Sequence, residues 1–175
     1  MRSKKSNISL IGFMGAGKSS VGPILARMLK KDFIELDMEI EKASGSTISN
    51  IFTLYGEDHF RKMEKEILRI TLERENIVLS CGGGAIIDVQ NRRLLKDKSV
   101  VVWLDTSVEV IAERLRDDCS RPLLAGNLKK SIVNLLKKRL KLYREASEIR
   151  VQTDDMGIDQ IALYIVEKMG ARCDV

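Results

Sequence analysis

Residues 12–19 combine glycine, lysine and serine at a spacing that suits phosphate chemistry. They read Gly-Phe-Met-Gly-Ala-Gly-Lys-Ser and fit the pattern G-x-x-x-x-G-K-[ST] at every fixed position. Glycines let backbone N–H groups close around phosphate oxygens. We expect Lys18 to reach the β- and γ-phosphates of a nucleotide and the Ser19 hydroxyl to bind Mg²⁺ directly. A glycine-rich turn that binds nothing is the alternative. A buried-strand pattern before the motif and a helical pattern after it argue against that alternative.

Asp37 directly follows a short apolar strand pattern at residues 33–36. At the carboxyl end of a strand, its carboxylate would face the γ-phosphate. There it would accept a proton from a substrate hydroxyl or orient that hydroxyl for in-line attack. The alternative is a cap for the helix predicted from Met38 onward. The neighbouring phosphate loop favours the catalytic role.

Arg61 and Glu64 lie one turn apart in a long charged helical pattern. They form either a solvated i,i+3 pair or an arginine clamp for an anionic substrate, with Glu64 orienting the guanidinium.

Three successive glycines, Gly82, Gly83 and Gly84, follow a buried-strand pattern at residues 77–81. They indicate a close approach of backbone to another group, such as a substrate held by main-chain N–H groups. Ser80, just before them, is a candidate to hold a water on Mg²⁺. No aspartate ends this strand pattern, so the second metal carboxylate must come from elsewhere.

Two further arginines are candidates for anion contacts. Arg121 lies in a polar loop pattern at residues 117–127, where a closing lid would supply charge and exclude water; the alternative is an ordinary surface arginine. Arg139 shares a helix face with Tyr143 and is either a second anion contact or part of a basic stripe.

Other chemistries find little support in the sequence. His59 is the only histidine and is expected at the surface, which discounts zinc or Ser-His-Asp chemistry. The three cysteines, Cys81, Cys119 and Cys173, lack metal-site spacing, so we expect free thiols in a reducing cytoplasm. The absence of an N-K-x-D pattern argues against a switch-type GTPase.

The bulk composition is that of one globular domain. The 175 residues are 44% hydrophobic and 31% charged, with a net charge of +5. The apolar runs are short, and the basic N-terminus has no apolar segment before the phosphate loop. We therefore expect no membrane span and no secretory signal. The basic residues clustered near the C-terminal third have no interleaved aromatics before Tyr143, so small anions are favoured over nucleic acid as ligands.

Strand and helix patterns alternate along the chain. We predict strands at residues 8–11, 33–36, 77–81, 100–104 and 149–152. We predict helices at residues 18–30, 38–43, 48–55, 57–73, 88–95, 106–116, 128–145 and 158–169. Gly56 should end one helix, and Thr106 with Glu109 forms a capping-box pattern. The alternation predicts an α/β fold, in which a parallel sheet covered on both faces gathers the candidate residues at the carboxyl ends of its strands.

The ordered set of motifs resembles that of the shikimate kinases, from residue 8 to residue 169. The matching features are the phosphate loop, Asp37, Phe60-Arg61-x-x-Glu64, Ser80 to Gly84, Arg121-Pro122-Leu123-Leu124, and Arg139 with Leu142-Tyr143. The resemblance implies a three-layer α/β/α P-loop kinase of one domain with a lid, and a five-stranded parallel sheet ordered 2-3-1-4-5. It also implies transfer of the ATP γ-phosphate to the 3-hydroxyl of shikimate in a cytoplasmic enzyme, which we expect to be a monomer.

The resemblance further implies roles for single residues. Asp37 would contact the substrate hydroxyls, and Arg61 and Arg139 would bind the substrate carboxylate, within substrate-binding helices at about residues 37–73. Gly82, Gly83 and Gly84 would line the substrate site, with Arg121 beside ATP and Arg114 near the adenine. We also expect ATP contacts from Gly15, Ala16, Gly17, Lys18, Ser19, Ser20 and Gln152.

One departure from the family pattern affects the metal site. The usual Asp-x-Asp is here Glu35-Leu36-Asp37, so the carboxylate on the metal side is longer by one methylene. We expect Glu35 and Ser80 to reach Mg²⁺ through water. A gluconate-kinase-like enzyme for small molecules and a non-catalytic nucleotide-binding module remain as alternatives.

Overall fold

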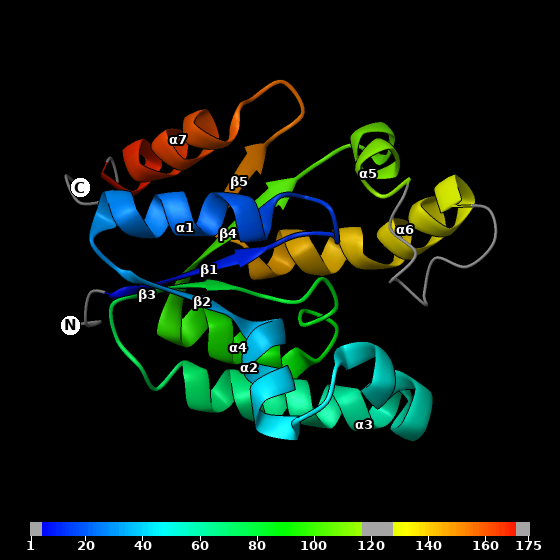
Figure 1. Cartoon of the computed structure of the whole chain (residues 1–175). Helices are drawn as coiled ribbons and strands as arrows, with labels where there is room; N and C mark the ends of the chain where they lie inside the picture. Colours follow the sequence, from blue (N-terminus) through cyan, green and yellow to red (C-terminus); the bar gives the residue numbers. More distant parts are fainter. Residues whose placement is uncertain (1–4, 117–127, 171–175) are drawn as a thin grey trace.

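A five-stranded parallel sheet runs through the centre of the molecule (Figure 1). The computed structural model describes residues 5–116 and 128–170. The strands are β1 (Asn7–Ile11), β2 (Asp32–Glu35), β3 (Ile77–Ser80), β4 (Ser99–Asp105) and β5 (Ile149–Gln152). Their order is β2-β3-β1-β4-β5, which confirms the predicted topology.

The central strands are buried on both faces, which explains their nearly continuous apolar sequences. In β1, Ile8 pairs in register with Val78 of β3 and Val100 of β4. Even-numbered residues such as Leu10 and Val102 face one buried cluster, while odd-numbered ones such as Ile11 and Trp103 face the other. The sheet therefore separates two cores.

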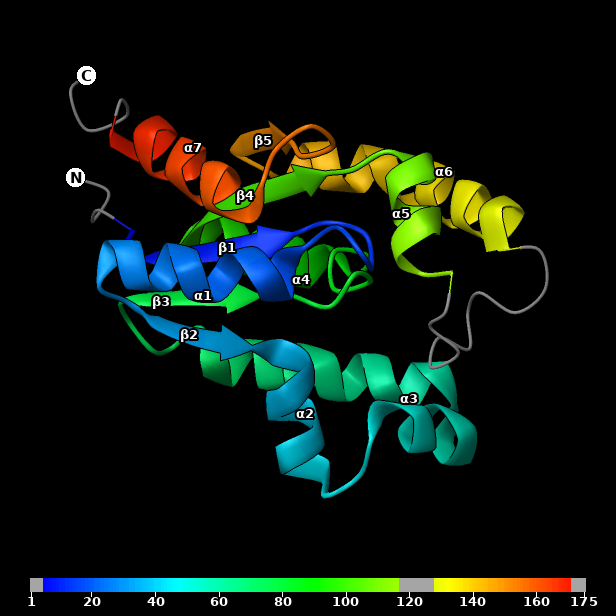
Figure 2. The same ribbon diagram turned by 45° about the horizontal axis from the view of Figure 1, so that its top comes forward.

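Helices cover both faces of the sheet (Figures 1 and 2). One layer contains α1 (Lys18–Leu29) and α7 (Ile158–Gly170). The other contains α4 (Val89–Lys98) and α6 (Leu128–Ala146), while α2 (Leu36–Ser44) and α3 (Ile48–Thr71) extend from the β2 edge. The short α5 (Val108–Arg114) follows β4. No helix within residues 5–116 and 128–170 is long and apolar enough to cross a membrane.

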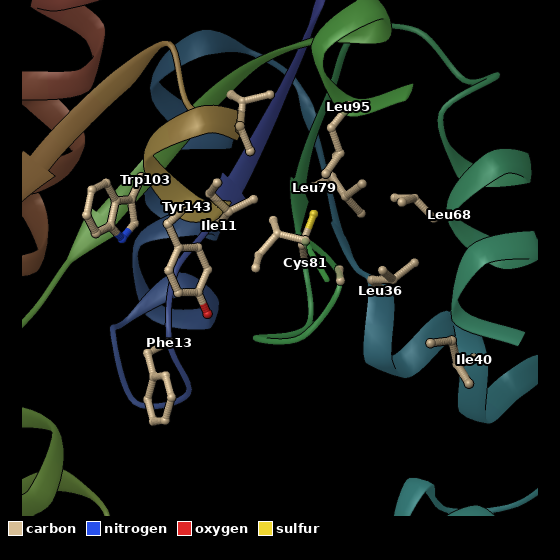
Figure 3. Close-up of a cluster of buried hydrophobic side chains, with 14 of the residues drawn as sticks. Ile11, Phe13, Leu36, Ile40, Leu68, Leu79, Cys81, Leu95, Trp103 and Tyr143 are labelled. Atoms are coloured by element: carbon tan, nitrogen blue, oxygen red, sulfur yellow. The ribbon is translucent and has the colours of Figure 1, made fainter. Parts of the chain in front are cut away.

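The larger of the two cores lies beneath the candidate site (Figure 3). Tyr143 of α6 is fully buried there, with its ring stacked 5.8 Å from that of Trp103. Figure 3 shows the Tyr143 hydroxyl pointing toward the turns that follow the strands. This packing holds α6 against the sheet. It also places Arg139, one turn before Tyr143 on the same helix, beside the candidate site.

The predicted break at Gly56 is confirmed. Its backbone, at φ 80° and ψ 172°, is not helical and divides α3 into two segments. At the start of α3, the Thr47 hydroxyl accepts a hydrogen bond from the Asn50 N–H and caps the helix. Residue 57 onward is therefore a separate helical segment, which carries Arg61 and Glu64.

Two local predictions were wrong. Strand β2 ends at Glu35, and Asp37 lies in the first turn of α2 instead of at a strand end. The cap of α2 is Glu35, so the capping alternative for Asp37 is also wrong. Helix α5 is capped by Ser107 and not by Thr106, because the Thr106 hydroxyl is buried and pairs at 2.6 Å with that of Thr153.

Candidate active site

The phosphate loop joins β1 to α1 and has the backbone that its glycines predict. Gly15 and Gly17 have φ values of 78° and 97°, a region that other residues rarely adopt. At Gly12, an added Cβ would lie 2.6 Å from the Leu104 carbonyl oxygen. Because α1 begins at Lys18, the positive end of its helix dipole faces the loop, where it can attract an anion.

Lys18 is buried inside this loop. Its ammonium donates hydrogen bonds of 3.0 Å to the carbonyl oxygens of Gly12 and Phe13. The following residues, Ser19 and Ser20, are exposed on the first turn of α1. The loop thus holds one cation in place and leaves two hydroxyls accessible from solvent.

Two cavities meet at Asp37. The first, of about 400 Å³, is lined by the phosphate loop together with Glu35 and Arg114. The second, of about 460 Å³, is lined by α2, α3, Arg61 and Arg139. Asp37 lines both cavities, as do Met14, Gly82 and Gly83. A ligand in one cavity can therefore meet a ligand in the other beside the Asp37 carboxylate.

Gly82 lies between two carboxylates. An added Cβ would lie 2.9 Å from both Asp37 Oδ1 and Glu64 Oε1, so a larger residue would displace these carboxylates. Burial raises the pKa of the Glu64 carboxyl; Asp37 raises it further, while Arg61 opposes the rise. Two acidic groups from different helices thus meet above the glycine turn.

Arg61 is held by two carboxylates of its own helix. Its Nη1 donates a 2.8 Å hydrogen bond to Glu64, which is only 1% exposed. Its Nε and Nη2 donate to Glu57 at 3.2 and 2.9 Å. The alternative of a solvated Arg61–Glu64 pair is therefore wrong, because Glu64 is buried against the site. Glu57 was not singled out from the sequence, although its i,i+4 spacing to Arg61 was the available signal.

Each of the other two glycines accommodates a different neighbour. At Gly84, an added Cβ would lie 2.4 and 2.6 Å from the terminal nitrogens of Arg61. The Gly83 carbonyl accepts hydrogen bonds from Tyr143 at 2.6 Å and from Arg139 at 3.3 Å. Arg139 is 5% exposed, so it is not part of a solvated basic stripe. The glycine turn therefore connects α3 and α6.

Glu35 and Ser80 are brought together at the ends of β2 and β3. They are partners in the strand register, and Ser80 Oγ donates a 2.7 Å hydrogen bond to Glu35 Oε1. Glu35 and Ser19 both line the first cavity and offer the hard oxygen atoms that Mg²⁺ prefers. Among the described residues, no three His, Cys, Asp or Glu side chains form a metal-binding group. This donor set suits a Mg²⁺ ion that takes its other ligands from phosphates and water.

The far wall of the first cavity combines Arg114 with an apolar surface. Arg114 Nη1 donates a 2.9 Å hydrogen bond to the Gly15 carbonyl. Met156, Ile158 and Ile161 also line this cavity. They carry no sequence signal beyond ordinary helix and loop patterns. Gln152 is exposed on β5, and its contact with ATP stays a prediction.

Two of the remaining candidates, His59 and Cys81, lie within the described residues. His59 is exposed, with its ring 5.0 Å from that of Tyr55, as expected of a surface residue. Cys81 is a free, buried thiol that borders the first cavity. Arg121 and the predicted lid at residues 117–127 lie outside the described residues, as do Cys119 and Cys173.

A parallel sheet of this order with a phosphate loop beside a second cavity defines a P-loop kinase acting on a small molecule. The family model for shikimate kinase matches residues 14–170. The chain belongs to the shikimate kinase family. It is 43% identical to a shikimate kinase of Persephonella marina over 163 residues, which are 93% of this chain and 98% of that protein.

Solved structures agree with this assignment. The shikimate kinase of Acinetobacter baumannii in complex with shikimate matches with a TM-score of 0.92 and 40% identity, over 95% of this chain and 93% of that one. A gluconokinase from Sinorhizobium meliloti matches with a TM-score of 0.59 and 21% identity, over 97% and 95% of the two chains. That likeness shows a shared fold alone.

Proposed function

We propose that this protein transfers the γ-phosphoryl group of ATP to the 3-hydroxyl of shikimate, giving shikimate 3-phosphate and ADP. The observation that carries the proposal is the pair of cavities that share Asp37. One contains the phosphate loop, and the other contains the buried Arg61 and Arg139. Family membership supports the choice of acceptor, since a family member at 40% identity has been solved with shikimate bound.

The first cavity suits the triphosphate. Lys18 and the N–H groups at the start of α1 would neutralise and orient the β- and γ-phosphates. Mg²⁺, when bound, supplies further positive charge to the phosphates. Ser19 would bind it directly, with Glu35 and Ser80 acting through water. Arg121 remains the proposed lid arginine.

The second cavity suits a hydroxylated carboxylate. Arg61 and Arg139 would bind the carboxylate, and this fixes the ring so that one hydroxyl lies at Asp37. The hydroxyl oxygen forms a bond to the γ-phosphorus as the bond to the leaving ADP oxygen breaks. The hydroxyl proton passes to the Asp37 carboxylate. Positioning and charge neutralisation provide most of the catalysis in such a transfer.

We also infer that the enzyme acts in the cytoplasm as a monomer, with ATP and shikimate as its partners and without nucleic acid or membrane. The buried free thiol of Cys81 fits a reducing compartment. Size-exclusion chromatography with light scattering would test the monomer, and a dimer mass at working concentration would contradict it.

A coupled assay of ADP release tests the function. Shikimate, gluconate and nucleoside monophosphates would each be offered with ATP and Mg²⁺. We expect turnover with shikimate and little with the others; preferential turnover of gluconate would instead support the gluconate-kinase alternative. No turnover with any acceptor, together with ATP binding, would support a non-catalytic module.

An arginine variant tests the acceptor site separately. Arg61→Lys should weaken shikimate binding by about 1–3 kcal/mol, because lysine cannot form a bidentate fork with a carboxylate. The KM for ATP should change little. An equal loss for both ligands would point to misfolding or to a role of Arg61 in ATP binding.

A further inference from the structure

Glu57 contacts Arg61 in a way that the proposed chemistry does not yet use. One oxygen, Oε1, accepts hydrogen bonds from both Nε and Nη2 of Arg61, at 3.2 and 2.9 Å. The Glu57 side chain is 45% exposed, compared with 21% for Arg61 and 1% for Glu64. Glu57 therefore holds the solvent side of the guanidinium, and Glu64 holds the buried side.

The hydrogen bonds of Arg61 leave a defined set of donors. A guanidinium has five N–H bonds, one on Nε and two on each terminal nitrogen. Among the residues that the structure describes, Glu57 takes one from Nε and one from Nη2, and Glu64 takes one from Nη1. One N–H remains on each terminal nitrogen. A carboxylate that binds in a bidentate way accepts two hydrogen bonds, which matches these two N–H groups.

The plane of the guanidinium is fixed by its neighbours. The guanidinium packs closely on Gly84. A Cβ at this glycine would lie 2.4 to 2.7 Å from Nη2, Nη1 and Cζ. The Phe60 ring centroid lies 5.1 Å from Cζ. These contacts restrict the faces of the guanidinium, and its edges are held by hydrogen bonds. Glu64 holds the edge at Nη1, and Glu57 holds the edge formed by Nε and Nη2.

We propose that Glu57 is a positioning residue for the substrate carboxylate. By holding Nε and Nη2, it keeps the Arg61 side chain in the conformation in which the two remaining N–H groups face the second cavity. Glu57 acts through Arg61 and does not itself touch the substrate. The proposal rests on the proposed function, in which Arg61 binds that carboxylate.

Removing the Glu57 side chain tests the proposal by steady-state kinetics with shikimate and ATP. Glu57→Ala should raise the KM for shikimate about three- to tenfold, the range for a half-exposed hydrogen bond between charged groups. The kcat and the KM for ATP should stay within about twofold, because the phosphate side is untouched. Glu57→Gln should recover most of the loss, since its amide oxygen can accept both N–H groups.

A double-mutant cycle separates positioning from charge. In an Arg61→Lys background there is no planar group to orient, so Glu57→Ala should have no further effect on the KM for shikimate. Glu66→Ala is the matched control. It removes the same charge from α3, where Glu66 pairs with Arg69 at the surface, and should leave all constants unchanged.

Several results would overturn the proposal. An unchanged KM for shikimate in Glu57→Ala would show that Glu64 alone suffices. A lowered KM would show that Glu57 repels the substrate, and an effect that persists in Arg61→Lys would show that it does not act through Arg61. These outcomes differ from failure of the proposed function, in which the wild-type enzyme would not phosphorylate shikimate at all.

Discussion

Ser80 Oγ donates a 2.7 Å hydrogen bond to Glu35 Oε1 across the ends of two adjacent parallel strands. The bond holds one oxygen of the longer carboxylate against β3. Glu35 also lines the first cavity. Ser80 thus holds the Glu35 carboxylate at the ends of the two strands.

The first prediction concerns this pair. Glu35→Ala should raise the Mg²⁺ concentration for half-maximal rate by about 10–100-fold, the usual range for a group that orients a metal's water ligands. Ser80→Ala should raise this Mg²⁺ concentration by less, and Glu35→Asp should leave it nearly unchanged. Titration of Mg²⁺ at saturating ATP measures all three. An unchanged midpoint in Glu35→Ala would reduce Glu35 to a solvated strand-end residue, and a large loss in Glu35→Asp would indicate direct binding of the metal.

Lys18→Met should lower kcat on the order of 10²-fold or more, because the buried ammonium stabilises charge that develops on the transferring phosphoryl group. Steady-state kinetics on folded protein measure the effect. Arg27→Met, which removes an exposed cation from the other end of α1, is the control and should retain the wild-type rate. A near-normal kcat in Lys18→Met would contradict the assignment of residues 12–19 as the loop that binds the phosphates of ATP.

Asp37→Asn should retain ATP binding while lowering turnover by about 10²–10⁴-fold, because an amide cannot accept the hydroxyl proton. Calorimetry for ATP and a turnover assay on the same preparation separate the two effects. Retained turnover would leave Asp37 with no role in proton transfer.

Gly84→Ala should raise the KM for shikimate by about tenfold or more, because the new methyl group displaces the Arg61 guanidinium from its place over the glycine. The KM for ATP should change little. Gly170→Ala, at a site with no atom within 4 Å, is the matched control. If the KM for shikimate is unaffected in Gly84→Ala, the position of Arg61 over this glycine does not matter for binding.

The Cys81 thiol should be unreactive in the native protein. Burial raises its pKa, an effect that the nearby Lys18 opposes but does not cancel, so little thiolate forms at neutral pH. In a Cys119→Ser/Cys173→Ser background, alkylation by iodoacetamide should be about 100-fold slower in buffer than in denaturant. Equal rates would show that the thiol is accessible in the folded state.

Local sequence patterns predicted much of the fold. The alternation of strands and helices, the Gly56 break and the backbone of the phosphate loop are confirmed, whereas the strand order, also confirmed, was implied by the family resemblance. Where local patterns allowed two solutions, the prediction failed. Thr106 and Ser107 both precede α5, and the sequence alone does not show that Thr153 engages the Thr106 hydroxyl.

The sequence by itself determined the phosphate loop and the alternation of strands and helices, because both follow from local backbone preferences and from residue spacing within one element. Only the tertiary structure decided the environment of the acceptor side. It placed Asp37 on a helix, buried Glu64, and gave each of the three glycines its own neighbour from α2, α3, α6 or the phosphate loop. Such contacts join segments that are distant in the chain, so their burial and geometry exist only once the segments have packed against one another.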